Sequence, residues 1–276
     1  MSGHGKASDS LRPVGGPGDF AAAFNVSRET IDRLKTYESL LRQWQKAVNL
    51  VASGTLDAVW HRHFADSAQL LALAPPGPRH WIDLGSGAGF PGLVVAILLA
   101  GTLSPRAAPT SPSAPTARGE SRGEGQNQVP HPNPLPMEEW GEGIGATHVT
   151  LIEGDTRKGA FLREVVRQTG LLAGKSGSVA VDILPIRAES VRIKVNLSLP
   201  RVICARALAP LDRLLEFAAP LSPPGTTLLL CKGKGVAGEL QMAEKAWNFD
   251  VELVPSVTDR DGRIAVITNL DRKAKD

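Results

Sequence analysis

The chain has 276 residues, and 42% of them are hydrophobic, which is enough to bury the core of one large domain or two small ones. Its net charge of +3 and sequence pI near 9.0 are compatible with a nucleic-acid partner without requiring one. Two cysteines exclude a disulfide framework, and no apolar run approaches the ~20 residues that span a bilayer, so we expect a cytoplasmic protein that works away from membranes. We also expect it to be a monomer.

Helical patterns dominate the beginning of the chain. Residues 1–26 begin with a polar, glycine-rich stretch, and we expect a disordered tail there. From Ser27 onward, apolar residues recur at steps of three and four, which predicts a helix that Ser27 caps. A second helix is predicted over 56–73, where a run of prolines ends it. Residues 27–75 are therefore predicted to form a helical section.

Residues 79–270 alternate between strand and helix patterns. The predicted strands are 81–85, 149–154, 179–186, 201–207, 226–233 and 263–268. Helices are predicted over 90–100 and 157–170. Strands that alternate with helices favour an α/β fold with a mostly parallel sheet.

Residues 102–145 interrupt this alternation. They hold eight of the chain's 21 prolines and show almost no apolar periodicity. Such a segment buries too little apolar surface to offset the entropy of ordering it. We therefore expect a disordered insertion at the surface of the α/β domain.

A glycine-rich loop follows the first predicted strand, in the sequence DLGSGAGFPG that begins at Asp83. Gly87, Gly89 and Gly92 match the dinucleotide fingerprint G-x-G-x-x-G. The run from Asp83 to Gly89, with Gly85 between them, also matches acid-x-G-x-G-x-G, which is typical of S-adenosylmethionine (SAM) enzymes. Both templates place the glycines in a strand-loop-helix turn, where a ligand approaches the bare backbone.

The charge of Asp83 separates these two templates. A dinucleotide places a doubly negative pyrophosphate at the loop, and a carboxylate at the strand end opposes it. SAM brings an ammonium and a sulfonium instead, for which Asp83 supplies a compensating charge. The sequence favours SAM, and a NAD-dependent oxidoreductase stays open as the alternative.

Glu153 ends the next predicted strand, where its carboxylate can accept hydrogen bonds from ribose hydroxyls. In dinucleotide-binding folds such an acid lies about 20 residues beyond the glycines. Glu153 lies 64 residues after Gly89, but the separation falls to 20 when the 44 residues of 102–145 are left out. The insertion hypothesis and the cofactor hypothesis therefore support each other.

The ordered motifs of the chain resemble those of the RsmG (GidB) family of bacterial 16S ribosomal RNA guanine-N7 methyltransferases. The similar stretches are WQKAVNLVA at 44–52, HFADS at 63–67, DLGSGAGFPG at 83–92, RKGAFLREV at 157–165, RAES at 187–190, ARALAPL at 205–211 and CKGKG at 231–235. The resemblance implies a class I SAM-dependent methyltransferase, Rossmann-like with a seven-stranded, mostly parallel sheet, behind the helical N-terminal section.

The resemblance also implies roles for individual residues. Gly85 and Phe90 would contact SAM in the glycine loop. Ala188 and Glu189 would lie beside its adenine, and Arg206 would lie where SAM meets the target base. The family's target is guanine 527 in the usual rRNA numbering, so the implied partner is 16S ribosomal RNA or the small ribosomal subunit.

Methylation of guanine N7 needs no general base, because N7 carries a free lone pair and no proton. Positioning of the reactants can supply roughly 7–11 kcal/mol of the barrier. Arg206 suits a guanine partner, since a guanidinium donates to O6 or to a nearby phosphate. The residues expected to bind RNA phosphates are Lys232, Lys234, Arg157 and Lys158.

The short run that holds His61, His63 and Asp66 does not predict a metal site, because it lacks a further spaced ligand and methyl transfer needs no metal. We expect a hydrogen-bonded cluster that shapes the RNA or SAM pocket. The long insertion leaves one non-enzymatic alternative open, a catalytically impaired RNA-binding protein.

Overall fold

The computed structural model describes residues 13–77, 79–102, 147–171, 179–191 and 201–274. The predicted insertion over 102–145 lies outside these residues apart from Thr102, which ends a helix. Most of the predicted tail, residues 1–12, lies outside them as well.

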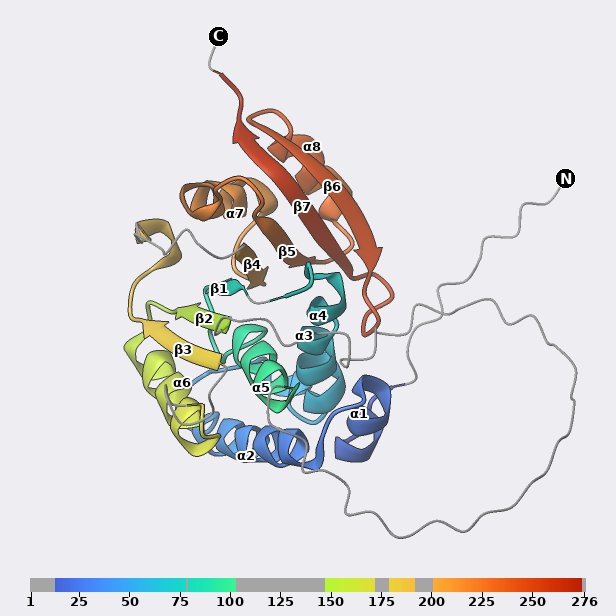
Figure 1. Cartoon of the computed structure of the whole chain (residues 1–276), viewed down its shortest axis with the longest axis vertical. Helices are drawn as coiled ribbons and strands as arrows, with labels where there is room; N and C mark the ends of the chain where they lie inside the picture. The colour runs from blue at the N-terminus through green and yellow to red at the C-terminus, as the bar shows by residue number, and fades with distance from the viewer. Residues whose placement is uncertain (1–12, 78, 103–146, 172–178, 192–200, 275–276) are drawn as a thin grey trace, which may run out of the picture.

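A seven-stranded sheet forms the centre of the molecule (Figure 1), in the order β3-β2-β1-β4-β5-β7-β6. The first five strands of this order are parallel, and β7 runs antiparallel to both of its neighbours. The strands are β1 (His80–Leu84), β2 (Thr147–Ile152), β3 (Val179–Leu184), β4 (Arg201–Arg206), β5 (Thr227–Lys232), β6 (Trp247–Pro255) and β7 (Arg263–Arg272). The expected seven-stranded, mostly parallel sheet is confirmed.

Helices cover both faces of the sheet. The α-helices are α1 (Pro17–Phe24), α2 (Arg28–Trp44), α3 (Asp66–Ala68), α4 (Leu70–Leu73), α5 (Gly92–Thr102), α6 (Thr156–Gln168), α7 (Leu211–Ala218) and α8 (Val236–Ala243). Short 3-10 turns lie at Ser53–Thr55, Ala188–Ser190 and Ala219–Leu221, and Trp60–Ala65 forms a π-helix, η2. No helix of the described residues is long and apolar enough to cross a membrane.

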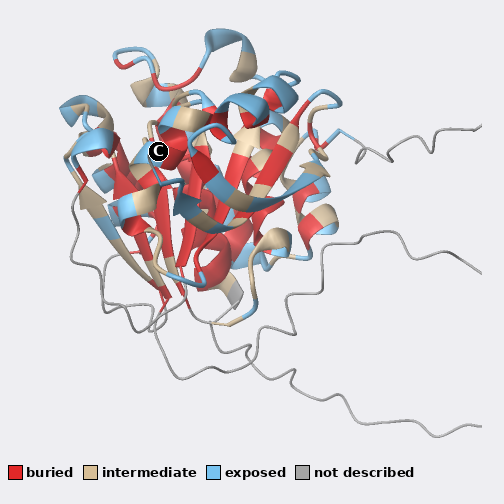
Figure 2. Cartoon of the chain, turned by 90° about the horizontal axis from the view of Figure 1, so that it is seen from above, coloured by how far each residue is buried: buried red, intermediate tan, exposed pale blue. Residues whose placement is uncertain are grey.

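Alternate residues of the central strands supply the two halves of the core. In β4, Val202 and Cys204 face the cluster that contains α2, α5 and α6, whereas Ile203 and Ala205 face the cluster that contains α7 and α8. This period of two is the pattern of a strand that is buried on both faces. Figure 2 shows the buried residues concentrated along the sheet, with the exposed ones on the outer sides of the helices.

The helix predicted from Ser27 is confirmed as α2, and the Ser27 hydroxyl caps it by accepting from the Thr30 N–H. The prediction of a disordered tail over residues 1–26 is wrong for its last part, because residues 17–24 form α1. Its Phe20 and Phe24 are buried, and Phe20 packs edge-on against Trp60 with ring centres 5.6 Å apart. Burial of these rings stabilises a helix that composition alone does not reveal.

The prediction of a single helix over 56–73 is also wrong, since this segment is divided into η2, α3 and α4. The N–H of Asp66 bonds to the carbonyls of both His61 and His63, and the Ser67 hydroxyl donates to the His63 carbonyl at 2.7 Å. The bond to the His61 carbonyl spans five residues and widens the turn, and such widened turns are frequent at functional sites.

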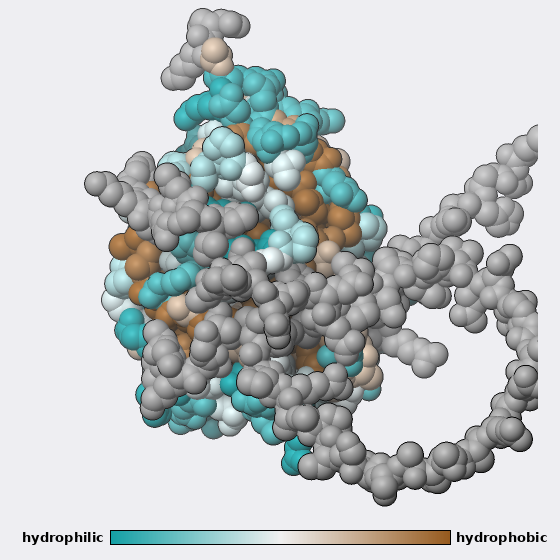
Figure 3. Space-filling view, in the orientation of Figure 1, coloured by the Kyte–Doolittle hydropathy of each residue, from teal (hydrophilic) through white to brown (hydrophobic). Residues whose placement is uncertain are grey.

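The elements β6, α7 and α8 were not predicted from the sequence. Most residues of β6 are exposed or half-buried, so its apolar alternation is weak. Figure 3 shows hydrophilic side chains at the end of the molecule where β6, β7 and α8 lie, with apolar ones between them. The helix predicted over 90–100 begins at Gly92, directly after Pro91.

Candidate functional site

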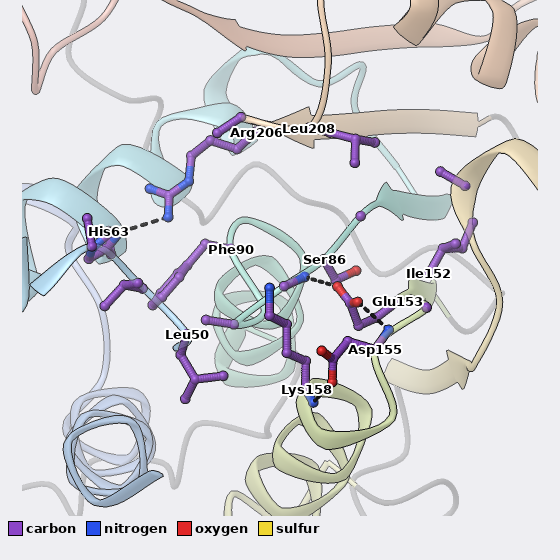
Figure 4. Close-up of a pocket in the computed structure, with 18 of the residues that line it drawn as sticks. Leu50, His63, Ser86, Phe90, Ile152, Glu153, Asp155, Lys158, Arg206 and Leu208 are labelled. Atoms are coloured by element: carbon purple, nitrogen blue, oxygen red, sulfur yellow. Dashed lines mark hydrogen bonds between the residues drawn. The ribbon is translucent and has the colours of Figure 1, made fainter. Parts of the chain in front are cut away.

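A cavity of about 1000 Å³ opens at the carboxyl ends of β1, β2 and β4. Its walls come from the glycine loop (residues 85–90), the segments after β2 and β3, the end of β4, and the N-terminal helical section. Figure 4 shows Ser86, Glu153, Phe90 and Arg206 around this space. It lies over the neighbouring strands β1 and β4, where the strand order of the sheet reverses, and open α/β sheets bind ligands at this position.

The glycine loop adopts a backbone that other residues rarely accept. Gly85, Gly87 and Gly89 have φ angles of 68°, 57° and 91°. A Cβ on Gly85 would lie 2.5 Å from Leu208, and one on Gly89 would lie 2.6 Å from the Tyr37 hydroxyl. At Gly87 the nearest atom would be 3.8 Å away, so this backbone is open on its cavity side. The loop therefore needs glycine for conformation, and at two positions also for space.

Asp83 lies beneath this loop and does not line the cavity, contrary to the expectation that it faces the ligand. Its side chain is fully buried and accepts a hydrogen bond from the Gly92 N–H at 3.0 Å. Burial raises the pKa of Asp83 to about 6, although the hydrogen bond to Gly92 opposes this. Gly89 does not line the cavity either, so both residues act on it through the shape of the loop.

Glu153 lies at the cavity wall directly after β2, as predicted. Its Oε2 accepts from the Gly87 N–H and its Oε1 accepts from the Asp155 N–H, both at 2.7 Å (Figure 4). Each carboxylate oxygen keeps a further lone pair for a hydroxyl in the cavity. Ala188 and Glu189, which follow β3, also line the cavity.

Tyr37 supports the loop from α2, a contact that the sequence reading missed. Its hydroxyl donates to the Ala88 carbonyl, and its ring stacks on Phe90 with centres 5.3 Å apart. Burial raises the pKa of Tyr37 well above its usual range, so the hydroxyl stays a donor. The one signal in the sequence is that this only tyrosine of the chain lies on the apolar face of its helix.

The Phe90 ring stacks on two other rings, those of Tyr37 and His63. The centre of the His63 ring lies 4.8 Å from that of Phe90, and the Arg206 guanidinium lies 5.0 Å from the Phe90 centre. Phe90 lines the cavity, but only 4% of its surface is exposed. Its main structural role is therefore to join the glycine loop to the residues that hold Arg206.

Arg206, the last residue of β4, is held by the segment that contains η2 and α3. Its Nη1 donates to the Arg62 carbonyl at 3.0 Å and lies 3.2 Å from Asp66 Oδ2. Its Nη2 lies 2.7 Å from His63 Nδ1 (Figure 4). These contacts fix the guanidinium at the cavity wall, at a position that the sequence reading identified.

The contact with Arg206 fixes the protonation of His63. A guanidinium only donates, so Nδ1 must accept and the ring is neutral, with its proton on Nε2. That Nε2 lies 2.8 Å from the Thr55 hydroxyl, which in turn donates to the Ala52 carbonyl at 2.7 Å. Burial, reinforced by the charge of Arg206, lowers the pKa of His63 to about 3.

Asp66 joins this arrangement to the turn between β6 and β7. Its Oδ1 accepts from the Thr258 hydroxyl at 2.6 Å and from the Gln69 amide at 2.9 Å. The Gln69 Oε1 accepts from the Val257 N–H at 2.9 Å. We call His63, Asp66, Gln69, Arg206 and Thr258 the Asp66 network.

The expected hydrogen-bonded cluster is confirmed for His63 and Asp66. His61 lies apart from it and accepts from the Val14 N–H at 3.3 Å. The described residues contain no group of histidine, cysteine, aspartate and glutamate side chains that is arranged to hold a metal ion.

The four predicted RNA-binding residues separate into two groups. Arg157 and Lys158 line the cavity at the start of α6, and Lys234 is exposed after β5. Lys232 does not face solvent, since only 8% of its side chain is exposed. Its Nζ donates to the Ala209 carbonyl at 3.1 Å and pairs with Glu239, so the ammonium is already occupied and this geometry gives no support to the predicted phosphate contact.

The chain matches the model of a known family, described as rRNA small subunit methyltransferase G, over residues 30–102 and 145–264. Ribosomal RNA small subunit methyltransferase G of Parvibaculum lavamentivorans is 41% identical, over 91% of this chain and 88% of that protein. The protein of that name from Rhodospirillum centenum is 42% identical, over 91% of this chain and 90% of its own.

Solved structures resemble the chain more distantly. A Corynebacterium glutamicum protein is 16% identical with a TM-score of 0.46, over 84% of this chain and 89% of that one. A Methanococcus maripaludis protein is 8% identical with a TM-score of 0.49, and the match covers 86% of this chain and 94% of that one. At this level of similarity, these structures carry no information about ligands.

Proposed function

Because this chain belongs to the rRNA small subunit methyltransferase G family, we propose that it transfers the methyl group of SAM to N7 of a guanine in 16S ribosomal RNA. The guanine that the family resemblance implies is 527 in the usual rRNA numbering. One observation supports the proposal most directly. The glycine loop, Glu153 and the fixed guanidinium of Arg206 line a single cavity at the switch point of the sheet.

The residues of the cavity suit SAM. Glu153 has lone pairs left for the two ribose hydroxyls, and the buried Ala188 offers an apolar surface beside Glu189 for the adenine. Gly85 and Gly87 expose backbone to the cavity, where the amino-acid part of SAM would lie. When bound, SAM supplies an electrophilic methyl group on a positively charged sulfur.

The protein's part in this reaction is to bind and orient. Guanine N7 attacks through its own lone pair, so no side chain needs to remove a proton, and the new N–C bond forms as the S–C bond breaks. Arg206 cannot act as a base, because a guanidinium keeps its protons, but it can donate to guanine O6 beside N7. Its bonds to His63 and Asp66 hold it in place before RNA arrives.

The cations around the cavity suit an RNA backbone. Arg157 and Lys158 lie at its wall, and Lys234 is exposed beyond β5. Contacts of this kind position an RNA without reading its sequence, and they weaken as salt increases. Family membership gives no support to the alternative of a NAD-dependent oxidoreductase.

Transfer of labelled methyl from SAM to small subunits prepared from cells that lack this protein tests the proposal. N7-specific cleavage then locates the modified base, and we expect label at a single guanine. Subunits from cells that contain the protein are the control and should take up little label. If the folded protein binds SAM and RNA but transfers no methyl group, the proposal fails and the impaired RNA-binding protein is the better interpretation.

A further inference from the structure

A second cavity of about 260 Å³ lies beside the first, over the ends of β4 and β5 and under the turn between β6 and β7. Four residues line both cavities: Asp66, Arg206, Ala207 and Asp259. Arg206 therefore stands between a large space on the β1–β3 side and a small one on the β5–β7 side. A small polar space next to the proposed cofactor cavity is where an acceptor group would enter.

Three carboxylates line the second cavity, and two of them are already engaged. Asp66 accepts from Thr258 and Gln69 and pairs with Arg206. Glu239 accepts from the Leu211 N–H at 2.7 Å and pairs with Lys232. Asp66 is thus engaged at both of its carboxylate oxygens. Both contacts of Glu239 fall on Oε2, and Glu239 does not line the first cavity.

Asp259 differs from these two carboxylates. Its Oδ1 accepts one backbone N–H, from Asp261 at 3.0 Å, and its Oδ2 lies 3.6 Å from an Arg62 nitrogen, at a distance longer than a hydrogen bond. The side chains of this pair are 44% and 47% exposed, so the pairing is weak and solvent-screened. Asp259 thus keeps acceptor capacity at the boundary of the two cavities.

The backbone that carries Asp259 is well fixed. The Gly262 N–H bonds to the Asp259 carbonyl at 3.0 Å, and the Ser256 N–H bonds to the Gly262 carbonyl at 3.1 Å. Thr258, directly before Asp259, donates to Asp66 of the N-terminal section. Figure 1 shows the end of the β6–β7 hairpin beside α3 and α4. A recognition group needs this kind of support from its surroundings.

We propose that the second cavity receives the target guanine and that Asp259 accepts hydrogen bonds from its N1–H and exocyclic amino group. This inference rests on the proposed function and adds the residue that selects the base. Guanine carries donors on its Watson–Crick edge and acceptors at O6 and N7. A carboxylate on one side and Arg206 on the other match this polarity, and enzymes that modify a base commonly read that edge after taking the base out of its stack.

The test compares two proteins on two substrates. Small subunits are reconstituted from ribosomal RNA in which the target guanosine is either retained or replaced by inosine, which keeps N7 and O6 but lacks the exocyclic amino group. The proteins are wild type and Asp259→Ala, and kcat/KM for methyl transfer is measured for all four combinations. Asp261→Ala is the matched control, because Asp261 is an exposed carboxylate of the same turn that lines neither cavity.

We expect inosine to reduce kcat/KM of the wild type by about tenfold, the effect of losing one hydrogen bond to a charged group. Asp259→Ala should lose at least as much with guanosine and show no further loss with inosine, because the partner of the amino group is already gone. The KM for SAM should stay unchanged in both variants, and Asp261→Ala should behave as wild type.

Two results would overturn the inference while leaving the proposed function intact. Either Asp259→Ala methylates guanosine as fast as wild type does, or it discriminates against inosine as strongly. Failure of the wild type to methylate the guanosine subunits would instead contradict the proposed function itself. The two failures are therefore distinguishable in one experiment.

Discussion

The two sides of the candidate site are built differently. On the cofactor side, bonds between neighbours in the sequence form the turn of the glycine loop, from Gly89 to Ser86 and from Gly92 to Asp83, and more distant residues such as Tyr37 and Glu153 then support it. On the acceptor side, the Asp66 network joins residues near 66 to Arg206 and to a turn near 258. A local motif can therefore specify the turn on the first side, whereas the guanidinium on the second side is held only by residues far away in the sequence.

The largest effect is expected from Gly89→Ala, which tests whether the cofactor side depends on the local backbone. The new Cβ would meet Tyr37 and Leu93 at 2.6 Å, at a residue with φ of 91°. We expect a loss of at least about 2 kcal/mol in the free energy of unfolding, together with loss of SAM binding. Urea unfolding and SAM titration measure both.

Gly170→Ala is the matched control for Gly89→Ala. Gly170 also has a positive φ, of 72°, but no atom lies within 4 Å of its new Cβ. This variant should lose only about 1 kcal/mol and bind SAM normally. Equal losses in the two variants would show that backbone strain alone, without the contact to Tyr37, accounts for the need for glycine.

Arg206→Ala removes the residue that both sides share. We expect kcat to fall by more than tenfold while the fold and the affinity for SAM are largely retained, because Arg206 orients the base. Arg206→Lys should rescue little, since a lysine cannot reproduce the bonds to His63, Asp66 and the Arg62 carbonyl together. Near-normal turnover of either variant would refute the role of Arg206.

The contributions of the two sides to the free energy of unfolding should change with pH in opposite directions. The pKa of His63 is lowered to about 3 in the folded protein, so the unfolded chain binds that proton first as pH falls. Its contribution to stability is complete above pH 6.5 and is lost as pH falls from 6.5 toward 3, by up to about 1.4 kcal/mol per pH unit. His63→Gln should lack this part of the pH dependence of unfolding.

Asp83 on the cofactor side should act in the opposite direction. Its pKa is raised to about 6, so the folded protein holds the proton more tightly than the unfolded chain, and stability falls as pH rises from about 4 through 6. Relative to Asp83→Asn, the wild type should become less stable over this interval. Urea unfolding of both proteins at several pH values gives the sign, and a flat difference would contradict the assignment.

Thr258→Val removes a single hydrogen bond of the Asp66 network and should have a smaller effect than Arg206→Ala. Valine keeps the shape of threonine but removes the bond to Asp66, while Gln69 continues to hold that carboxylate. We expect kcat/KM for small subunits to fall three- to tenfold, in the range of one hydrogen bond, with the KM for SAM unchanged. Thr268→Val, farther along β7, is the control, and an equal effect there would argue against a specific contribution of the network.

The sequence predicted the cofactor side better than the acceptor side for a physical reason. Glycines, an acid at a strand end and periodic apolar residues are local signals, and they placed β1, β2 and Glu153 correctly. The contact of His63 with Arg206 and that of Lys232 with the Ala209 carbonyl join residues that are separated by 143 and 23 positions. No local pattern reveals those partners, and Asp259 likewise gains its place beside both cavities only from the completed fold.

The smallest effects, on RNA affinity and its salt dependence, are expected from the two lysines of the CKGKG motif. These lysines look alike in the sequence but should behave differently. Lys234 is exposed, so Lys234→Ala should weaken RNA binding about two- to threefold and reduce the slope of log affinity against log salt by about 1. Lys232→Met should leave that slope unchanged, because its ammonium is occupied by Glu239 and the Ala209 carbonyl. RNA binding measured across a salt series decides between them. Equal slopes in the two variants would mean that Lys232 leaves its ion pair to meet the RNA, and the acceptor side would then rearrange on binding.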